Sequence, residues 1–304
     1  MLRRVAIGLA LLVATACSGE SSQTAPSPSL SPATATSTTP GPIATPTPSA
    51  AAPSTPTGPQ PAWLARLNSH RLSFGVPAVG ENADLSAGDT KHAKYMANLG
   101  SVTRVEDPAS RHFTESGNAA GATSLVASGF DTQAQFVDAW AASPFQLINM
   151  LDSRLTASGF GMVTGNFGTM AAMDVGSRTA DPLTDGWPRV WPTGETTIRE
   201  LAPVNEPDAT SGCAEPGETN WFGTPILVDF GTQATVESAE VALSVDGESL
   251  ETCVRVASDY SDELASGLMV GKVLIIPLDI LSKGAAIAGT VTTPAGTATV
   301  SFGT

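Results

Sequence analysis

The spacing of apolar residues changes between residues 178 and 187, and this change constrains the fold more than any other feature of the chain. From residue 61 to that point, apolar side chains recur at helical spacing and then in short strand-like runs. Beyond it, the helical period is lost and short apolar runs alternate with turn residues. The sequence therefore predicts an α+β unit over residues 61–178 and an all-β unit over residues 187–304.

The first unit contains three predicted helices, placed by their capping and helix-stopping residues. They are expected from Trp63 to a stop at Gly75–Pro77, from Ser86 to Gly100, and from a cap at Asp131 to Pro144. Residues 143–161 after the third helix read as a loop. This loop leads into a predicted hairpin over residues 159–176, in which two apolar runs flank the turn GNFG.

The second unit contains seven predicted strands separated by turn residues. These are residues 196–200, 224–230, 236–245, 252–258, 271–281, 286–293 and 296–302. Their alternating faces and short lengths are typical of an immunoglobulin-like sandwich. Each unit is long enough to bury its own core.

The first 16 residues have the form of a signal peptide, with two arginines, an apolar run and then small residues. The apolar run is too short to span a bilayer as a mature helix. The segment VATAC allows two interpretations: ordinary cleavage after an A-x-A site, or a bacterial lipobox in which Cys17 receives a lipid. Lipidation of Cys17 leaves an even pair, Cys213 and Cys253, which we expect to be disulfide-bonded in an oxidising compartment.

The segment after Cys17, up to residue 60, is rich in Ser, Thr, Pro and Ala and has almost no charge. Such a composition cannot bury a core, so residues 17–60 are predicted to be an extended tether. With the lipid, the tether would hold the folded part on the outer face of the cell membrane, within the cell envelope.

The charge balance excludes one class of partner. The chain has 29 Asp and Glu residues against 15 Lys and Arg residues, and loss of the signal peptide removes two arginines. An acidic protein of this kind is not expected to bind nucleic acid or an anionic bilayer surface. The scarcity of Lys and abundance of Ala, Gly, Thr and Pro are similar to the composition of proteins from high-GC actinobacteria.

Four segments of the first unit resemble the CAP superfamily (cysteine-rich secretory, antigen 5, pathogenesis-related 1) in its bacterial branch. They are LNSHRLSFGVPAV (67–79), DLSAGDTKHAKYM (84–96), FTESGNAAGATSL (113–125) and WAASPFQLINMLDSRLTASGFG (140–161). The resemblance implies an α-β-α sandwich with a central cleft. The second unit resembles, more weakly, the immunoglobulin-like domains that follow bacterial CAP domains, through WPRVWPTGETT (187–197) and TATVSFGT.

The resemblance also implies a cleft that often holds two His and two acidic residues, a set suited to a divalent cation. In this resemblance, Gln146 occupies the position where relatives have one His. Arg104 occupies the position of the other His, in a segment that continues to Glu106. One acidic position lies at Glu115, Ser116 or Gly117, and the other falls near Ser143. Because a guanidinium offers no lone pair, the metal set is predicted to be dismantled, with Arg104 pairing with Glu106 or Glu115 instead.

Other candidate residues are weaker. His112 could form a substitute site with Glu106 and Glu115, whereas His92 is expected to be packed or capping and His70 to lie on the surface. Three tryptophans, Trp187, Trp191 and Trp221, are interpreted as packing residues in preference to a ligand platform. No nucleophile elbow, zinc-protease or phosphate-loop motif occurs, so no catalytic residue, metal or cofactor is predicted.

Three functional hypotheses follow. The first is a non-catalytic envelope lipoprotein that binds a protein, a wall polymer or a lipid. The second is a lipid or sterol carrier, a role associated with some CAP relatives. The third is a hydrolase, which lacks identifiable acid–base or nucleophilic groups in this sequence.

Overall fold

The computed structural model describes residues 59–304 apart from 203–207, 211 and 214–220. The predicted signal peptide, Cys17 and almost all of the predicted tether lie outside the described residues. Among the helices that are described, none combines the length and apolarity needed to cross a membrane.

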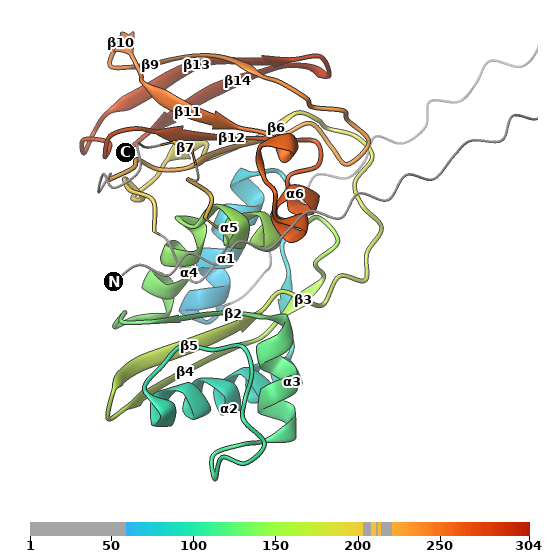
Figure 1. The fold of residues 1–304 in the computed structure, drawn as a ribbon, viewed down its shortest axis with the longest axis vertical. Helices are drawn as coiled ribbons and strands as arrows, with labels where there is room; N and C mark the ends of the chain where they lie inside the picture. The colour runs from blue at the N-terminus through green and yellow to red at the C-terminus, as the bar shows by residue number, and fades with distance from the viewer. Residues whose placement is uncertain (1–58, 203–207, 211, 214–220) are drawn as a thin grey trace, which may run out of the picture. The chain divides into compact units, whose positions relative to one another are not determined.

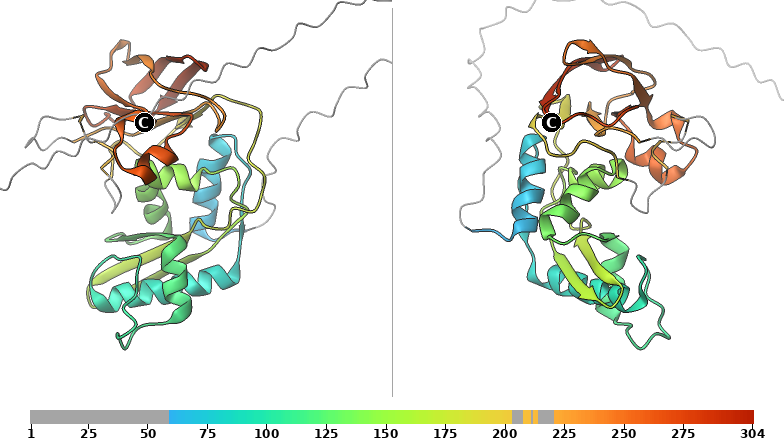
Figure 2. Two further views of the ribbon diagram at one scale, coloured as in Figure 1. Left: turned by 45° about the vertical axis from the view of Figure 1, so that its right-hand side comes forward. Right: turned by 90° about the vertical axis from the view of Figure 1, so that its left-hand side faces the viewer.

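The first part of the chain is a three-layer arrangement of helices around a three-stranded sheet, with a parallel two-stranded pair of β1 and β3 beside it (Figure 1). Its elements are α1 (Ala62–Ser73), β1 (Gly80–Glu81), α2 (Ala83–Leu99), α3 (Glu115–Thr123), β2 (Ser124–Ser128), α4 (Gln133–Ala141), α5 (Pro144–Met150), β3 (Ala157–Ser158), β4 (Phe160–Gly165) and β5 (Gly168–Asp174). The antiparallel sheet has the order β2-β5-β4. Helix α2 packs on β4 and β5, while α1, α4 and α5 cover the other face (Figure 2).

Glycines in the hairpin let α2 lie directly on the sheet. A Cβ at Gly161 would come within 2.1 Å of the Thr90 nitrogen, and one at Gly159 within 2.4 Å of the Leu85 carbonyl carbon. Such distances leave no room for a side chain. The glycines of the segment GFG are therefore required by close helix–sheet packing.

The second part consists of two sheets and a short helix. Its elements are β6 (Arg189–Trp191), β7 (Gly194–Glu195), β8 (Ile226–Asp229), β9 (Glu240–Val245), β10 (Glu248–Ser249), β11 (Thr252–Arg255), the 3₁₀ turn Ala257–Asp259, α6 (Glu263–Leu268), β12 (Lys272–Pro277), β13 (Ala286–Thr293) and β14 (Gly296–Gly303). One sheet has the order β10-β9-β13-β14-β7 and the other β11-β12-β8-β6. All pairs are antiparallel except β14 with β7.

The sheet that contains β8 and β12 is buried on both faces. Alternate side chains of β12 enter different clusters: Val273 and Ile275 pack with the five-stranded sheet, whereas Leu274 and Ile276 pack with residues of the first part. This explains why β12 is a continuous apolar run without alternation. One cluster thus includes Trp63 together with Leu274, so the separate cores expected for the two units are partly shared.

The structure corrects the helix boundaries in the first part. Helix α2 begins earlier than Ser86, because the Asn82 side chain caps it by accepting from the backbone nitrogens of Asp84 and Leu85, 2.9 and 3.2 Å away. Helix α4 is capped by Thr132 rather than by Asp131.

The segment after α4 was expected to be a loop, and this is wrong. Pro144 begins helix α5, because a proline at the first helical position lacks only an N–H that would have no partner inside the helix. Helix α3 was not predicted at all, because its small residues and two glycines give it a weak apolar stripe.

In the second part, six of the seven predicted segments contain strands. Residues 196–200 form no strand and contribute one isolated bridge, between Glu200 and Gly223. Helix α6 and the short strands β6, β7 and β10 were missed, because they are too short to show a period.

A buried guanidinium fixes the chain after α5. Arg71 in α1 is fully buried and donates to the carbonyl oxygens of Pro77, Met150, Asp152 and Leu155, at 2.6–3.2 Å. Burial lowers the pKa of Arg71 to about 10. These four acceptors compensate for desolvation of the charge, so Arg71 ties α1 to the loop that leads into the hairpin.

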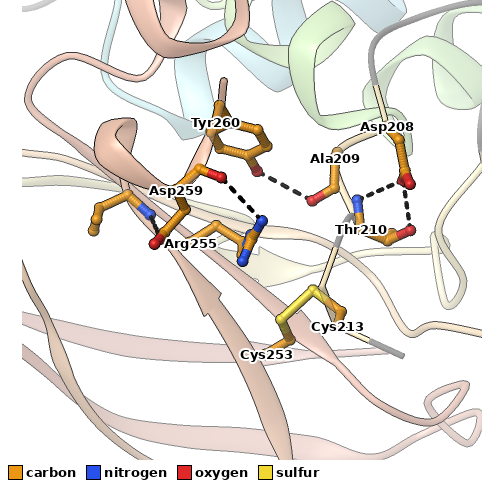
Figure 3. The surroundings of a disulfide bond; sticks show 9 residues. Asp208, Ala209, Thr210, Cys213, Cys253, Arg255, Asp259 and Tyr260 are labelled. Carbon is orange, nitrogen blue, oxygen red and sulfur yellow. Dashed lines mark hydrogen bonds between the residues drawn. A yellow bond between two sulfur atoms is a disulfide. The ribbon is translucent and has the colours of Figure 1, made fainter. Parts of the chain in front are cut away.

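The predicted disulfide between Cys213 and Cys253 is confirmed, with Cα atoms 5.4 Å apart. Figure 3 shows it beside Arg255, whose guanidinium lies over the Tyr260 ring at 5.3 Å. The Tyr260 hydroxyl donates to the Ala209 carbonyl at 3.1 Å, and its ring meets Phe145 of α5 edge-on. The bond therefore joins Cys213 to β11.

Candidate functional site

A cavity of about 420 Å³, here called the α5 cavity, is bounded by α3, β2, α5, the residues after β5, and α6. Its described lining residues are Arg104, Ala122, Thr123, Ser124, Leu125, Phe145, Gln146, Asn149, Val175, Gly176, Arg178, Leu264 and Leu268. Two predicted site residues, Arg104 and Gln146, thus face one cavity although they are far apart in the sequence. Both parts of the chain contribute to its wall, because Leu264 and Leu268 belong to α6.

Helix α5 places Gln146 in the cavity wall. Pro144 starts the helix, so Gln146 falls in its first turn, where it is buried to 2% exposure. One turn further along, Asn149 lines the same cavity and donates from Nδ2 to the Phe145 carbonyl at 2.8 Å. The helical spacing therefore puts two amide side chains on one wall.

Arg104 reaches the cavity from the loop between α2 and α3. The loop lies tightly on α3, since a Cβ at Gly121 would come within 2.4 Å of the Arg104 carbonyl oxygen. The Arg104 side chain is exposed, and its guanidinium makes no hydrogen bond or ion pair with any residue that the structure describes. The predicted pairing of Arg104 with Glu106 or Glu115 is therefore wrong.

Glu106 faces away from the cavity and is buried to 1% exposure. Its Oε1 lies 3.0 Å from Nδ1 of His92, and its Oε2 accepts from the Thr114 backbone nitrogen at 2.8 Å. His92 is itself fully buried, with Nε2 at 2.7 Å from the Thr103 carbonyl. The expectation of a packed His92 is confirmed. Because the Glu106 carboxylate is paired with His92, it is not available to pair with Arg104.

The substitute metal site built from His112, Glu106 and Glu115 does not form. Glu115 is exposed in the first turn of α3, and His112 is half-buried with Nε2 3.0 Å from the Nε of Arg111. Nowhere in the described part of the chain do three or more His, Cys, Asp or Glu side chains gather as metal ligands would.

A second arginine, Arg178, lines the cavity and was missed from the sequence. Its Nη2 donates to Oδ1 of Asn149 at 2.5 Å, and its Nε lies 3.1 Å from a carboxylate oxygen of Asp152. The same carboxylate lies 2.6 Å from Arg154. The only signal in the sequence is a cation two residues after Gly176, at the end of the hairpin, which points to no particular site.

A pair of carboxyl groups lies behind the cavity wall at Ser124. Asp89 of α2 is fully buried, lies 2.6 Å from the Ser124 hydroxyl, and accepts from the Asp174 backbone nitrogen at 3.1 Å. Burial raises the pKa of Asp89 to about 7, and the negative charge of Asp174 adds to the rise. The Asp174 carboxylate is held by Thr123 and the Gly176 nitrogen, at 2.6 and 3.0 Å.

The remaining candidates lie elsewhere. His70 was expected at the surface, but it is buried, with Nε2 3.1 Å from Asp138, and burial lowers its pKa. Trp191 is a core residue, as predicted, and Trp187 is half-buried under the Arg189 guanidinium. Trp221 is 69% exposed, so the packing role predicted for it is wrong.

Comparison with known families identifies this part of the chain. The family model described as the cysteine-rich secretory protein family (CAP) matches residues 64–176. Residues 64–176 therefore resemble a CAP domain. The α-β-α layers around the sheet β2-β5-β4 agree with that assignment. The comparison with curated proteins finds no match for the chain.

Proposed function

We propose that this protein is an exported, lipid-anchored envelope protein whose CAP domain binds a ligand in the α5 cavity without transforming it. The observation that carries the proposal is the lining of that cavity. It is open, it contains Arg104 and Gln146, and among its described lining residues there is no His, Cys, Asp or Glu. Those side chains are the usual general acids, bases and metal ligands.

A hydrolase is the less favoured alternative. Two described lining residues carry a hydroxyl beside a carboxylate: Thr123 lies 2.6 Å from Asp174, and the Ser124 hydroxyl lies 2.6 Å from Asp89. That hydroxyl is also 2.7 Å from the Ala120 carbonyl, and Ser124 is 1% exposed. A serine nucleophile needs a base beside it and an accessible oxygen. Ser124 has a buried carboxyl group beside it, but its own hydroxyl is buried and already hydrogen-bonded to Asp89 and the Ala120 carbonyl.

A carrier for lipids or sterols is the second alternative, and a specific observation favours it. Five apolar side chains larger than alanine line the described part of the cavity, contributed by Leu125, Phe145, Val175, Leu264 and Leu268. An apolar wall with a few polar groups is typical of a small-molecule site. The binding protein and the lipid carrier would therefore use the same cavity, and chemical identification of the bound molecule distinguishes the two functions.

Two further parts of the proposal concern segments beyond the cavity. Lipid on Cys17 and a tether to residue 60 would hold the CAP domain on the outer face of the membrane. The second part of the chain would be an immunoglobulin-like domain, supported by two largely antiparallel sheets that share one apolar cluster. Its role is to supply the α6 wall of the cavity and to bind a protein or wall polymer.

Native mass spectrometry of the purified full-length chain tests the ligand site. We expect a bound small molecule that is released by denaturation. The variant Ala122→Phe places a ring at the cavity wall, and Ala119→Phe is its control on the same exposed side of α3, outside the lining. Loss of the molecule from the first variant only is the expected result.

An occupant retained equally by both variants would place binding elsewhere and contradict the proposal. Turnover of ester or peptide substrates that is abolished by Ser124→Ala would instead favour the hydrolase, provided that the variant unfolds like the parent chain.

A further inference from the structure

We propose that the α5 cavity recognises an oxyanion, a carboxylate or phosphate group attached to an apolar body, with Arg104 and Arg178 as its counter-charges. This inference rests on the proposed function, since it names the chemistry of the ligand that the cavity holds.

The charge of the lining is the first observation. Every charged side chain among the described lining residues is an arginine, in a chain with 29 acidic and 15 basic residues. Two guanidinium groups at one concave surface create a positive potential that is focused by the apolar wall around it. A cation or a metal would be repelled there, whereas an anion would be attracted.

The availability of the guanidinium nitrogens is the second observation. Arg104 makes no hydrogen bond or ion pair within the described part of the chain, so its full donor set faces solvent and the cavity. Arg178 donates from Nη2 to Asn149, its Nε lies 3.1 Å from an Asp152 oxygen in an ion pair, and its Nη1 has no described partner. Planar guanidinium groups bind carboxylates and phosphates through two parallel donors.

The nearby acids do not cancel these charges. Asp152 is shared between Arg178 and Arg154, so one carboxylate serves two cations. Glu106 is buried against His92, and Asp89 and Asp174 lie behind the wall with their oxygens engaged. A ligand that brings its own negative charge would complete the site.

The apolar side of the cavity defines the rest of the ligand. Phe145 and Leu125 are buried in the wall, and Leu264 is 62% exposed at α6. Asn149 acts as a positioning residue, because its amide oxygen orients Arg178 toward the cavity. A phenyl ring is small enough to lie on this side of the 420 Å³ cavity while an attached anionic group reaches the arginines.

Calorimetry on the full-length chain tests the inference with phenyl phosphate and benzoate as the anionic probes and benzyl alcohol as the neutral one. We expect one-to-one binding of at least one anion, no measurable binding of the alcohol, and weaker binding at high salt. Tighter binding of phenyl phosphate would assign a phosphate ligand, and tighter binding of benzoate a carboxylate.

Matched variants make the result specific. Arg104→Gln should weaken binding of the anion by about tenfold or more, because a charge-assisted hydrogen bond is lost. Arg111→Gln removes the same charge from an exposed arginine outside the lining and should change the affinity by less than about twofold. Arg178→Lys should also weaken binding, whereas Arg154→Lys, which alters the other partner of Asp152, should not.

Equal affinity in the Arg104→Gln and Arg111→Gln variants would overturn the inference, as would binding of benzyl alcohol as tight as that of the anions. Absence of binding by all three probes would also overturn it. If a neutral molecule co-purifies and is displaced by Ala122→Phe, the ligand site stands and only its anionic character is refuted.

Discussion

Replacing Asp89 by Asn should remove a large part of the pH dependence of stability. Asp89 is fully buried, and its pKa is raised from 3.8 to about 7. The folded state therefore binds this proton more tightly than the unfolded state does. The corresponding contribution to the free energy of unfolding is complete below pH 3.8 and is lost as the pH rises toward 7.

The difference of about 3 pKa units corresponds to a loss of about 4 kcal/mol in stability between pH 4 and pH 8. An asparagine stays neutral and can keep the same contacts: its oxygen accepts from the Asp174 nitrogen and its amide donates to the Ser124 hydroxyl. We therefore expect Asp89→Asn to match the parent chain near pH 4 and to exceed its stability by up to about 4 kcal/mol at pH 8.

Urea unfolding of the two proteins between pH 4 and pH 8.5 provides the measurement, with the disulfide intact. Asp84→Asn is the control, because Asp84 is exposed on the same helix and has no buried charge to remove. A difference in unfolding free energy between Asp89→Asn and the parent that stays constant with pH would show that ionisation of Asp89 does not set this pH dependence.

Three further predictions concern the anchor, the disulfide and the buried arginine. Cys17→Ser should release the protein from the membrane fraction into the medium, and a membrane-bound variant would favour the A-x-A interpretation. Cys253→Ser opens a loop of 40 residues and should lower the free energy of unfolding by about 4 kcal/mol. The melting temperature should fall in a single transition because the core is shared, and separate transitions would contradict the shared core. Arg71→Met leaves four carbonyl groups without their donor and should lower the free energy of unfolding by at least about 3 kcal/mol. Replacing the half-exposed Arg66 by Met should lower it by less than about 1 kcal/mol, and equal losses would refute the role of Arg71.

Much of the fold could be predicted because its periodicity is strong and local. The hairpin over residues 159–176 and the strands β12, β13 and β14 follow from alternating or continuous apolar runs. Helices α3 and α6 could not be predicted, because short helices rich in small residues derive their stability from tertiary packing and show little period. The shared core could not be predicted, because the continuous apolar sequence of β12 shows that both its faces are buried but not which elements pack on them.

The site divides in the same way. Arg104 and Gln146 could be assigned through the resemblance to CAP domains, which aligns each with a known position in the cleft. Arg178 and Leu264 could not, because their roles depend on contacts across the chain: one arginine oriented by Asn149 and one leucine carried in by α6. The predicted pairing of Glu106 with Arg104 was also wrong, because the buried Glu106 carboxylate pairs with the buried His92 and Arg104 is exposed.

A crystal structure of the full-length chain with phenyl phosphate would show whether the α5 cavity binds an anion through its two arginines. We expect the phosphate group in the α5 cavity, with oxygens about 2.8 Å from guanidinium nitrogens of Arg104 and Arg178. We also expect the ring to lie against Phe145 and Leu264. A phosphate bound outside the cavity, or a molecule reversed with its ring on the arginines, would contradict the account.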